Sequence, residues 1–177
     1  MNFTDKLKLF YCWLVRLATA WLPDVPVFQS FRGALYAVAI KKCGTRFRVC
    51  HNVIINRPEL LEVGDNVYFA PGCVIAGGGE IRIGSNVLFG PNVVIAAANH
   101  KFDGTSFVNG YVFGKVVVAD NCWIGANVSL LMGTNVPASC IVGAGSVCNK
   151  RFEAPFALYA GNPAKFVKTL KVENTEL

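Results

Sequence analysis

Residues 63–74 read VGDNVYFAPGCV, two phrases of six residues that each begin with an apolar side chain. The phrase returns as IGSNVL and FGPNVV from Ile83, as IGANVS from Ile124 and as VGAGSV from Val142. Its first position can be followed through five groups of three, and all of these residues are apolar, where about half would be expected from average composition. They are Cys43, Val49, Ile55, Val63, Phe69, Ile75, Ile83, Phe89, Ile95, Val118, Ile124, Leu130, Val136, Val142 and Cys148.

Two other positions of the hexad indicate what each repeat builds. The fifth is small or β-branched almost throughout, and the fourth is rich in Asn and Gly, which tolerate the dihedral angles of a sharp corner. We therefore expect one short strand and one corner per hexad, with the first and fifth side chains pointing inward. The fourth positions include Asn52, Asn66, Gly72, Asn86, Asn92, Asn121, Asn127, Gly133 and Gly145, and the fifth include Val53, Val67, Cys73, Val87, Val93, Cys122, Val128, Thr134, Cys140 and Ser146.

Three hexads would close a triangular coil, and coils would stack through parallel strand ladders about 4.8 Å apart. An α-helix cannot hold this period, because six residues turn it by about 600° and scatter the apolar face. A sandwich of short strands would need hairpin turns at irregular intervals. The sequence thus predicts a mainly β protein: a helical cap over residues 1–42, a parallel β-helix over 43–152, and a turn, short helix and tail over 153–177.

Composition narrows the class of protein. Apolar residues make up 53% and charged residues 16% of the 177 residues, which is not typical of a disordered chain. No apolar run reaches the ~20 residues of a membrane-spanning helix, and the N-terminus lacks the pattern of a signal peptide. The seven cysteines are odd in number and mostly fall on core positions of the repeat. We therefore expect reduced thiols in a cytoplasmic protein.

The formal charge of +6 indicates the partners to expect. The basic residues gather at the two ends of the chain, over residues 6–42 and 150–171, and are not clustered with aromatic residues as in a nucleic-acid-binding protein. This placement is typical of a solvated surface, or of a membrane surface at one end and an anionic ligand at the other. The sequence contains no CxxC pair and no His/Cys cluster, so we expect no metal site.

The six-residue period stops at His100 and resumes only at Val118. We expect residues 101–117 to form a protruding loop, because the interval has no hexad period and three glycines typical of turns. Four aromatic residues make the loop too apolar for an idle surface, so it is expected to pack on a neighbouring subunit or an acceptor. They are Phe102, Phe107, Tyr111 and Phe113.

The two histidines have different surroundings in the sequence. His100 lies at the last corner before the insertion, outside the inward-facing positions, and an imidazole there could act as a base near neutral pH. His51 lies at the third position of an early hexad beside no break in the repeat. It is therefore expected to be an outward-facing polar residue.

The hexads, with the phrases Ile141–Ser146 and AGNPAK at Ala160–Lys165, resemble the hexapeptide-repeat acyltransferases. The resemblance extends over about residues 43–170 and is strongest to galactoside, maltose, xenobiotic and polysaccharide O-acetyltransferases. It implies a left-handed β-helix, a homotrimer with active sites between subunits, and acetyl-CoA as cosubstrate, with no metal. Neither the handedness nor the trimer follows from the spacing itself.

The resemblance also implies roles for individual residues. His100 matches the general base, and Asn99, Asp103 and Tyr111 lie near it as acceptor-side residues, with Asp103 or a backbone carbonyl as the group that orients the imidazole. Trp123 borders the cleft near the acetyl group, or else is a wedge that seals adjacent coils. The donor-side residues are Ala126, whose N–H meets the thioester, Ala144, Asn149 and Lys150 along the pantetheine arm, and Lys165 and Lys168 at the CoA phosphates. The spacing of the last two would place them on one face of a short helix.

The segment before the repeat has two interpretations. Residues 4–22 are expected to form a helix that begins at Thr4 or Asp5 and ends before Pro23, apolar around most of its circumference. It could cap the first coil, or it could lie on a membrane surface, since its aromatic and cationic side chains suit the headgroup region. The enzyme would then be cytoplasmic or peripheral on the inner face of the membrane, with a saccharide or lipid-linked glycan as acceptor.

Four functions remain to be compared. The main hypothesis is an acetyl-CoA-dependent saccharide O-acetyltransferase of surface polysaccharide biosynthesis. The alternatives are an N-acetyltransferase of an aminosugar and a non-catalytic β-helix scaffold that has no affinity for CoA. A carbonic anhydrase of the same fold would need three histidines around a metal, and the chain contains two.

Overall fold

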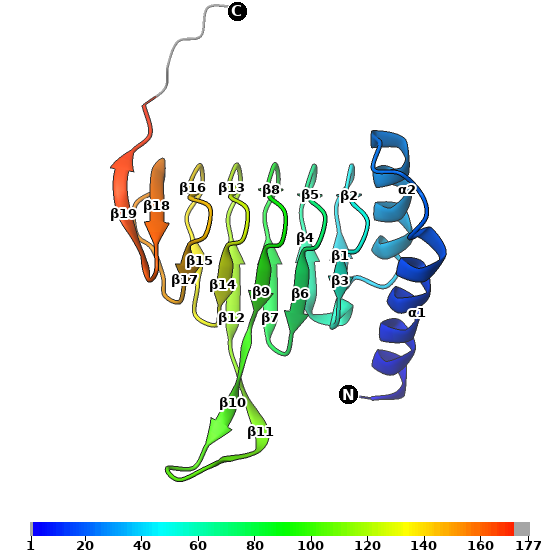
Figure 1. Cartoon of the computed structure of the whole chain (residues 1–177), viewed down its shortest axis with the longest axis horizontal. Coiled ribbons are helices and arrows are strands. Elements are labelled where there is room, and N and C mark those ends of the chain that lie inside the picture. The colour runs from blue at the N-terminus through cyan, green and yellow to red at the C-terminus, as the bar shows by residue number, and fades with distance from the viewer. Residues whose placement is uncertain (1, 172–177) are drawn as a thin grey trace, which may run out of the picture.

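The computed structural model, which describes residues 2–171, places the hexads on a column of stacked coils (Figure 1). Each coil contributes strands to three sheets, and strands from successive coils pair in parallel. Val63 pairs with Ile83 and Phe69 with Phe89, so the same hexad position faces the same side in every coil. The prediction of a mainly β protein built from parallel stacked coils is confirmed.

The three sheets run along the whole column. The first contains β1 (Lys42–Cys43), β4 (Leu61–Val63), β7 (Glu80–Ile83), β12 (Lys115–Val118) and β15 (Asn135–Val136). The second contains β2 (Arg48–Val49), β5 (Tyr68–Phe69), β8 (Leu88–Phe89), β13 (Trp123–Ile124), β16 (Ile141–Val142), β18 (Ala157–Gly161) and β19 (Ala164–Thr169). The third contains β3 (Ile54–Ile55), β6 (Val74–Gly77), β9 (Val94–Ala96), β14 (Ser129–Leu131) and β17 (Val147–Cys148).

The interior of the column is built from the two predicted hexad positions. Fourteen of the fifteen first-position residues are buried, the exception being the half-buried Cys43. All ten of the named fifth-position residues are buried as well, including Thr134 and Ser146. Their hydroxyls donate to the backbone oxygens of Cys148 (2.8 Å) and Gly143 (2.6 Å), which offsets the cost of burying a polar group.

The corners confirm the role of the fourth position. All nine of the Asn and Gly residues predicted there have positive φ, for example 56° at Asn52. Along one corner these side chains form a ladder: Asn66 donates to Asn86 (3.0 Å), and Asn86 donates to Asn121 (3.1 Å). Arg46 and Ser139 occupy the same corner position with φ of 55° and 57°, although neither residue type favours it.

All seven cysteines are free thiols, and six of them are buried. Burial disfavours the charged thiolate, and it raises the pKa of Cys148 to about 12. The thiols of the core therefore act as small apolar side chains.

Two helices lie at the N-terminal end of the column (Figure 1): α1 (Phe3–Thr19) and α2 (Pro26–Ala37). Helix α1 begins at a capping box in which Asn2 Oδ1 accepts from the Asp5 N–H (2.8 Å) and the Asp5 carboxylate accepts from the Asn2 N–H (3.1 Å). The predicted start at Thr4 or Asp5 is therefore wrong, because Asn2 supplies the cap. A 3₁₀ turn, Pro58–Leu60, follows the first coil. Within the described residues, neither helix is long and apolar enough to cross a bilayer.

The predicted loop and the predicted short C-terminal helix are both β-hairpins. The insertion forms β10 (Ala98–Phe102) and β11 (Phe107–Phe113), which protrude from the side of the column (Figure 1). The short C-terminal helix is wrong: β18 and β19 pair antiparallel, and β18 also pairs with β16 of the last coil. An open sheet edge has unpaired backbone groups, and this hairpin covers the last coil on that face. Residues 172–177 of the predicted tail lie outside the described residues.

Candidate functional site

His100 lies on the first strand of the protruding hairpin, directly opposite Tyr111 on the second. The two rings are 4.9 Å apart between centroids and inclined at 41°, and both side chains are exposed. The register of the hairpin shifts between His100 and Lys101, which makes a β-bulge on the partner strand near Gly110. Bulges bend a strand and re-aim its side chains, so the antiparallel ladder together with this bulge sets the direction of the imidazole.

A groove of about 560 Å³ lies beside His100. Four stretches of chain that are distant in sequence line it. They are Leu9 of α1, Asn56 and Arg57 after β3, residues 76–78, and a fourth stretch from β9 and the hairpin: Ala96, Ala98, Asn99, His100, Tyr111 and Phe113. Successive coils approach closely in its lining, because a Cβ on Gly78, whose φ is 93°, would lie 2.5 Å from the Cβ of Ala98. The polar residues that line the groove are Asn56, Arg57, Asn99, His100 and Tyr111.

Two of the three predicted acceptor-side residues line this groove. Asn99 precedes His100 on β10, and Tyr111 faces it across the hairpin. Asp103 lies instead at the tip of the hairpin, where its carboxylate accepts the N–H groups of Thr105 and Ser106, both at 2.9 Å. These hydrogen bonds hold the pKa of Asp103 at about 2. Asp103 therefore stabilises the turn, and within residues 2–171 no hydrogen bond joins it to His100.

His51 is held in a different cluster, which the sequence did not reveal. Its backbone N–H donates to Asp24 Oδ1 (2.9 Å), its ring contacts the other carboxylate oxygen, and the buried Arg32 donates to Oδ1 (2.6 Å). Partial burial opposes ionisation of Asp24, but the hydrogen bonds from His51 and Arg32 outweigh it and lower the pKa of Asp24 below its usual value. The ring of His51 is exposed, as predicted, yet it contacts Asp24, whose ion pair with Arg32 ties α2 to the first coil.

A second groove, of about 490 Å³, lies on the sheet that contains β8, β13 and β16. Trp123 lines it with its side chain about half exposed, so this residue is not a wedge sealed between coils. Phe156 and Lys171, from the chain after the last coil, also line the groove. Nothing in the sequence indicated that either residue lies beside Trp123. None of its lining residues lines the groove of His100.

The other predicted donor-side residues lie near the C-terminal end of the column. Ala126 and Ala144 occupy the third hexad position at one corner of successive coils, and neither N–H donates to an acceptor in residues 2–171. Asn149 and Lys150 lie after β17, at the same corner line from which the hairpin emerges.

Lys165 and Lys168 lie on β19 rather than on a helix, so the argument that a three-residue spacing places them on one helix face does not apply. Both are exposed, and neither has a carboxylate within 4.0 Å among the residues that the structure describes. Like Lys150, which follows β17, both lysines belong to the chain at the C-terminal end of the column. Within residues 2–171 no group of three His, Cys, Asp or Glu side chains could hold a metal.

Comparison with known proteins gives three related findings. No protein-family model matches the chain. A Staphylococcus aureus (strain Mu50) protein named "Putative acetyltransferase" is 39% identical over 115 residues, which span 64% of this chain and 56% of that protein. The chain therefore matches little more than half the length of this curated relative.

Solved structures match over nearly the whole chain. A hexapeptide-repeat acetyltransferase from Vibrio cholerae, complexed with acetyl-CoA, has 25% identity and a TM-score of 0.79 over 94% of this chain and 88% of that one. A maltose O-acetyltransferase from Clostridium difficile has 25% identity and a TM-score of 0.79 over 96% of this chain and 90% of that one. The resemblance predicted from the hexads is confirmed: in sequence and in fold, the chain is similar to the hexapeptide-repeat acetyltransferases.

Proposed function

We propose that this protein is an acetyl-CoA-dependent O-acetyltransferase that modifies a saccharide hydroxyl, with His100 as the general base. One observation supports this most directly: an exposed imidazole on the protruding hairpin lines a groove that combines apolar residues with the polar side chains of Asn56, Arg57, Asn99 and Tyr111. Such a groove can hold a sugar against the base while most of its surface excludes water.

The chemistry needs few groups. The imidazole takes the proton of the acceptor hydroxyl as the hydroxyl oxygen attacks the thioester carbonyl of acetyl-CoA. The tetrahedral intermediate carries a negative oxygen, which a backbone N–H such as that of Ala126 would stabilise. The carbon–sulfur bond then breaks, the CoA sulfur takes the proton from His100, and the acetyl ester remains on the acceptor.

The site would be completed by a second copy of the chain, in a homotrimer. Within one chain, the groove of His100 shares no lining residue with the groove of Trp123, and the cations of β19 lie near the far end of the column. The hairpin bears the large exposed side chains of Phe102, Phe107 and Phe113, which a neighbouring subunit would cover. A hairpin packed on a neighbour would bring His100 to that neighbour's donor groups.

We expect Lys165→Glu to raise the KM for acetyl-CoA, because it replaces a cation proposed to contact a CoA phosphate by an anion. The increase should be about tenfold with kcat nearly unchanged, since the phosphates are remote from the reacting carbon. Steady-state kinetics with varied acetyl-CoA measure it. Lys42→Glu, the same change on the first coil, is the control, and an unchanged KM in Lys165→Glu would remove this lysine from the donor site.

The activity itself is tested with purified protein, acetyl-CoA and a panel of neutral sugars, aminosugars and polysaccharide fragments. We expect release of free CoA thiol together with a sugar product whose mass rises by one acetyl group. An ester is cleaved by hydroxylamine and an amide is not, so this treatment separates O-acetylation from N-acetylation. Absence of CoA binding in a calorimetric titration would instead identify a non-catalytic scaffold.

A further inference from the structure

Helix α1 presents a row of large apolar side chains to solvent. Its members are separated alternately by four and three residues, the spacing that places side chains on one helix face. They are Phe3, Leu7, Phe10, Leu14 and Leu17, followed in the next turn by Trp21, and their exposed fractions run from 41% at Leu14 to 78% at Trp21. We call these six residues the outer stripe.

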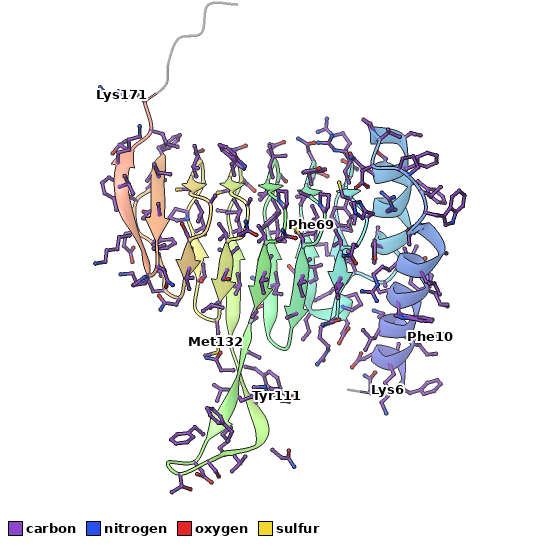
Figure 2. All side chains as sticks on the ribbon, in the orientation of Figure 1. Lys6, Phe10, Phe69, Tyr111, Met132 and Lys171 are labelled. Carbon is purple, nitrogen blue, oxygen red and sulfur yellow. The ribbon has the colours of Figure 1, made fainter. Side chains whose placement is uncertain are left out.

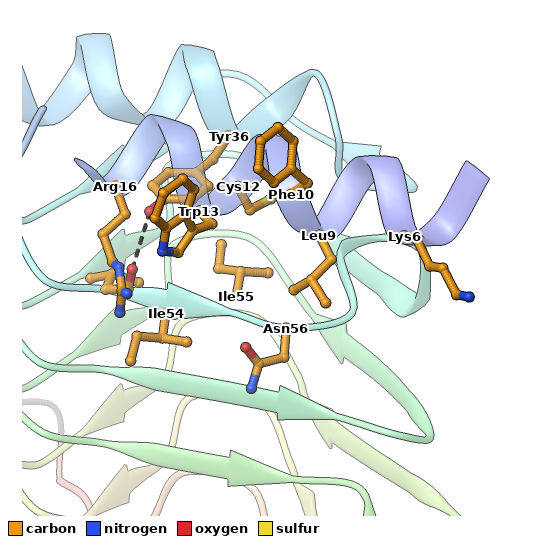
Figure 3. Close-up of a pocket in the computed structure, with 11 residues that line it drawn as sticks. Lys6, Leu9, Phe10, Cys12, Trp13, Arg16, Tyr36, Ile54, Ile55 and Asn56 are labelled. Atoms are coloured by element: carbon orange, nitrogen blue, oxygen red, sulfur yellow. Dashed lines mark hydrogen bonds between the residues drawn. The ribbon is translucent and has the colours of Figure 1, made fainter. Parts of the chain in front are cut away.

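The opposite face of α1 packs on the rest of the chain. Cys12, Val15 and Thr19 are buried against the first coil and α2. Figure 3 shows Leu9 and Trp13 pointing toward the strand of Ile54 and Ile55, whereas Phe10 points away from it. A groove of about 510 Å³ separates this inner side from the coil. Of the outer stripe, Phe10 alone lines this groove, and its ring stacks on that of Trp13 at a centroid distance of 5.7 Å.

Helix α2 and the loop before it widen the exposed surface. Val27, Phe31 and Val38 are at least half exposed, and Val25 is 43% exposed. With the outer stripe they add to the exposed apolar side chains of the two helices, which lie at the N-terminal end of the column (Figure 1); Figure 2 shows one of them, Phe10, on α1. An exposed apolar surface of this extent normally binds a protein partner or a membrane.

The charge of the chain is concentrated at the same end. Residues 1–50 carry eight Lys and Arg and two Asp and Glu, whereas residues 51–177 carry nine of each, so the formal charge of +6 lies in the first 50 residues. Both acidic residues there already have partners: Asp5 accepts a hydrogen bond in the helix cap, and Asp24 contacts Arg32 and His51. Lys6, Lys8 and Arg16 of α1 have no carboxylate within 4.0 Å among residues 2–171.

We propose that the outer faces of α1 and α2 bind the surface of an anionic lipid bilayer, with the outer stripe in the headgroup and acyl boundary. Phenylalanine, leucine and tryptophan with flanking lysines are typical of helices that lie in this boundary. A second copy of the chain is a poorer partner, because two like-charged ends would repel each other. The apolar surface of two helices is also wider than the narrow seam through which two helices pair in a coiled coil, which argues against dimerisation of this kind.

This binding would place the candidate active site close to the bilayer. Leu9 of α1 lines both the groove under the helix and the groove of His100, and Asn56 is also shared by the two. An acceptor carried on a lipid would therefore reach His100 along the inner side of the same helix. The bilayer proposal does not depend on the acceptor, and it can be tested without any enzyme assay.

The test is sedimentation of the full chain with vesicles of phosphatidylcholine alone or of phosphatidylcholine mixed with phosphatidylglycerol. We expect binding to the anionic vesicles, weakened by salt, and at least about tenfold weaker binding in the double variant Leu7→Ser, Leu14→Ser. Phe107→Ser, which removes a still more exposed apolar side chain from the hairpin, should bind like the parent. In a Trp123→Phe background, the remaining fluorescence of Trp13 and Trp21 should shift to the blue on binding.

Circular dichroism and light scattering on the double variant show whether its helices and its oligomeric mass are kept. Two results would overturn the proposal. One is a parent protein that stays in the supernatant with anionic vesicles at low salt. The other is a double variant that binds vesicles normally but has a smaller oligomeric mass, which would make the outer stripe a contact between subunits.

Discussion

Replacing His100 by alanine is expected to lower kcat for acetyl transfer by ~10²-fold or more, while the protein folds and assembles as before. The side chain is exposed on a hairpin that protrudes from the column, so its removal leaves no cavity in the core. The loss arises because the acceptor hydroxyl would have to lose its proton without a base in contact. Initial rates with saturating acetyl-CoA and acceptor measure the effect.

The matched control uses the other histidine of the chain. His51→Asn removes an imidazole whose contact is Asp24, and turnover should stay within about twofold of the parent when it is measured well below the unfolding temperature. If His100→Ala turned over at the parent rate, the role of general base would be wrong, whatever the fold of the chain.

Replacing Phe69 by alanine is expected to destabilise the protein by about 3–5 kcal/mol. Phe69 is fully buried in the middle of the column (Figure 2), and its ring lies between those of Phe47 and Phe89, at centroid distances of 5.7 and 4.7 Å. Removing it takes the central member from a stack that spans three coils and leaves a cavity that rigid neighbouring strands cannot fill. Chemical denaturation, followed by circular dichroism, measures the change.

The control for this prediction is Phe107→Ala on the hairpin, where the ring is 76% exposed. Its free energy of unfolding should change by about 0.5 kcal/mol or less in the isolated chain. A loss of less than about 1 kcal/mol for Phe69→Ala would show that the stack is not a main source of stability.

The core of the column could be predicted residue by residue, because it follows from the period alone. A coil repeats the same geometry at every sixth residue, so the hexad position decides whether a side chain such as Ile124 or Val128 is buried. The corners followed for a similar reason, since Asn and Gly accept positive φ at low cost. Arg46 and Ser139 could not be predicted this way: stacking on the neighbouring coil imposes the corner on residues that do not favour it.

The C-terminal segment shows where local sequence was misleading. Pro163 before an apparent helix pattern suggested a helix, but residues Ala164–Thr169 form the strand β19. Local propensity is weak over six residues, and the adjacent open edge of the last coil offers backbone partners to a hairpin. The pairing with β18 therefore decided the structure of a segment that its own residues left open.

By itself, the sequence determined the triangular column, its buried positions, the place where the repeat breaks and the histidine at that break. Only the tertiary structure decided which side chains meet at that break: Leu9 from α1 lies beside His100, and Asp103 lies in the turn. It also decided the separate cluster of Asp24 with Arg32 and His51. The reason is physical. A periodic backbone fixes positions along the coil, whereas the approach of helices and hairpins to that coil depends on contacts between segments that share no period.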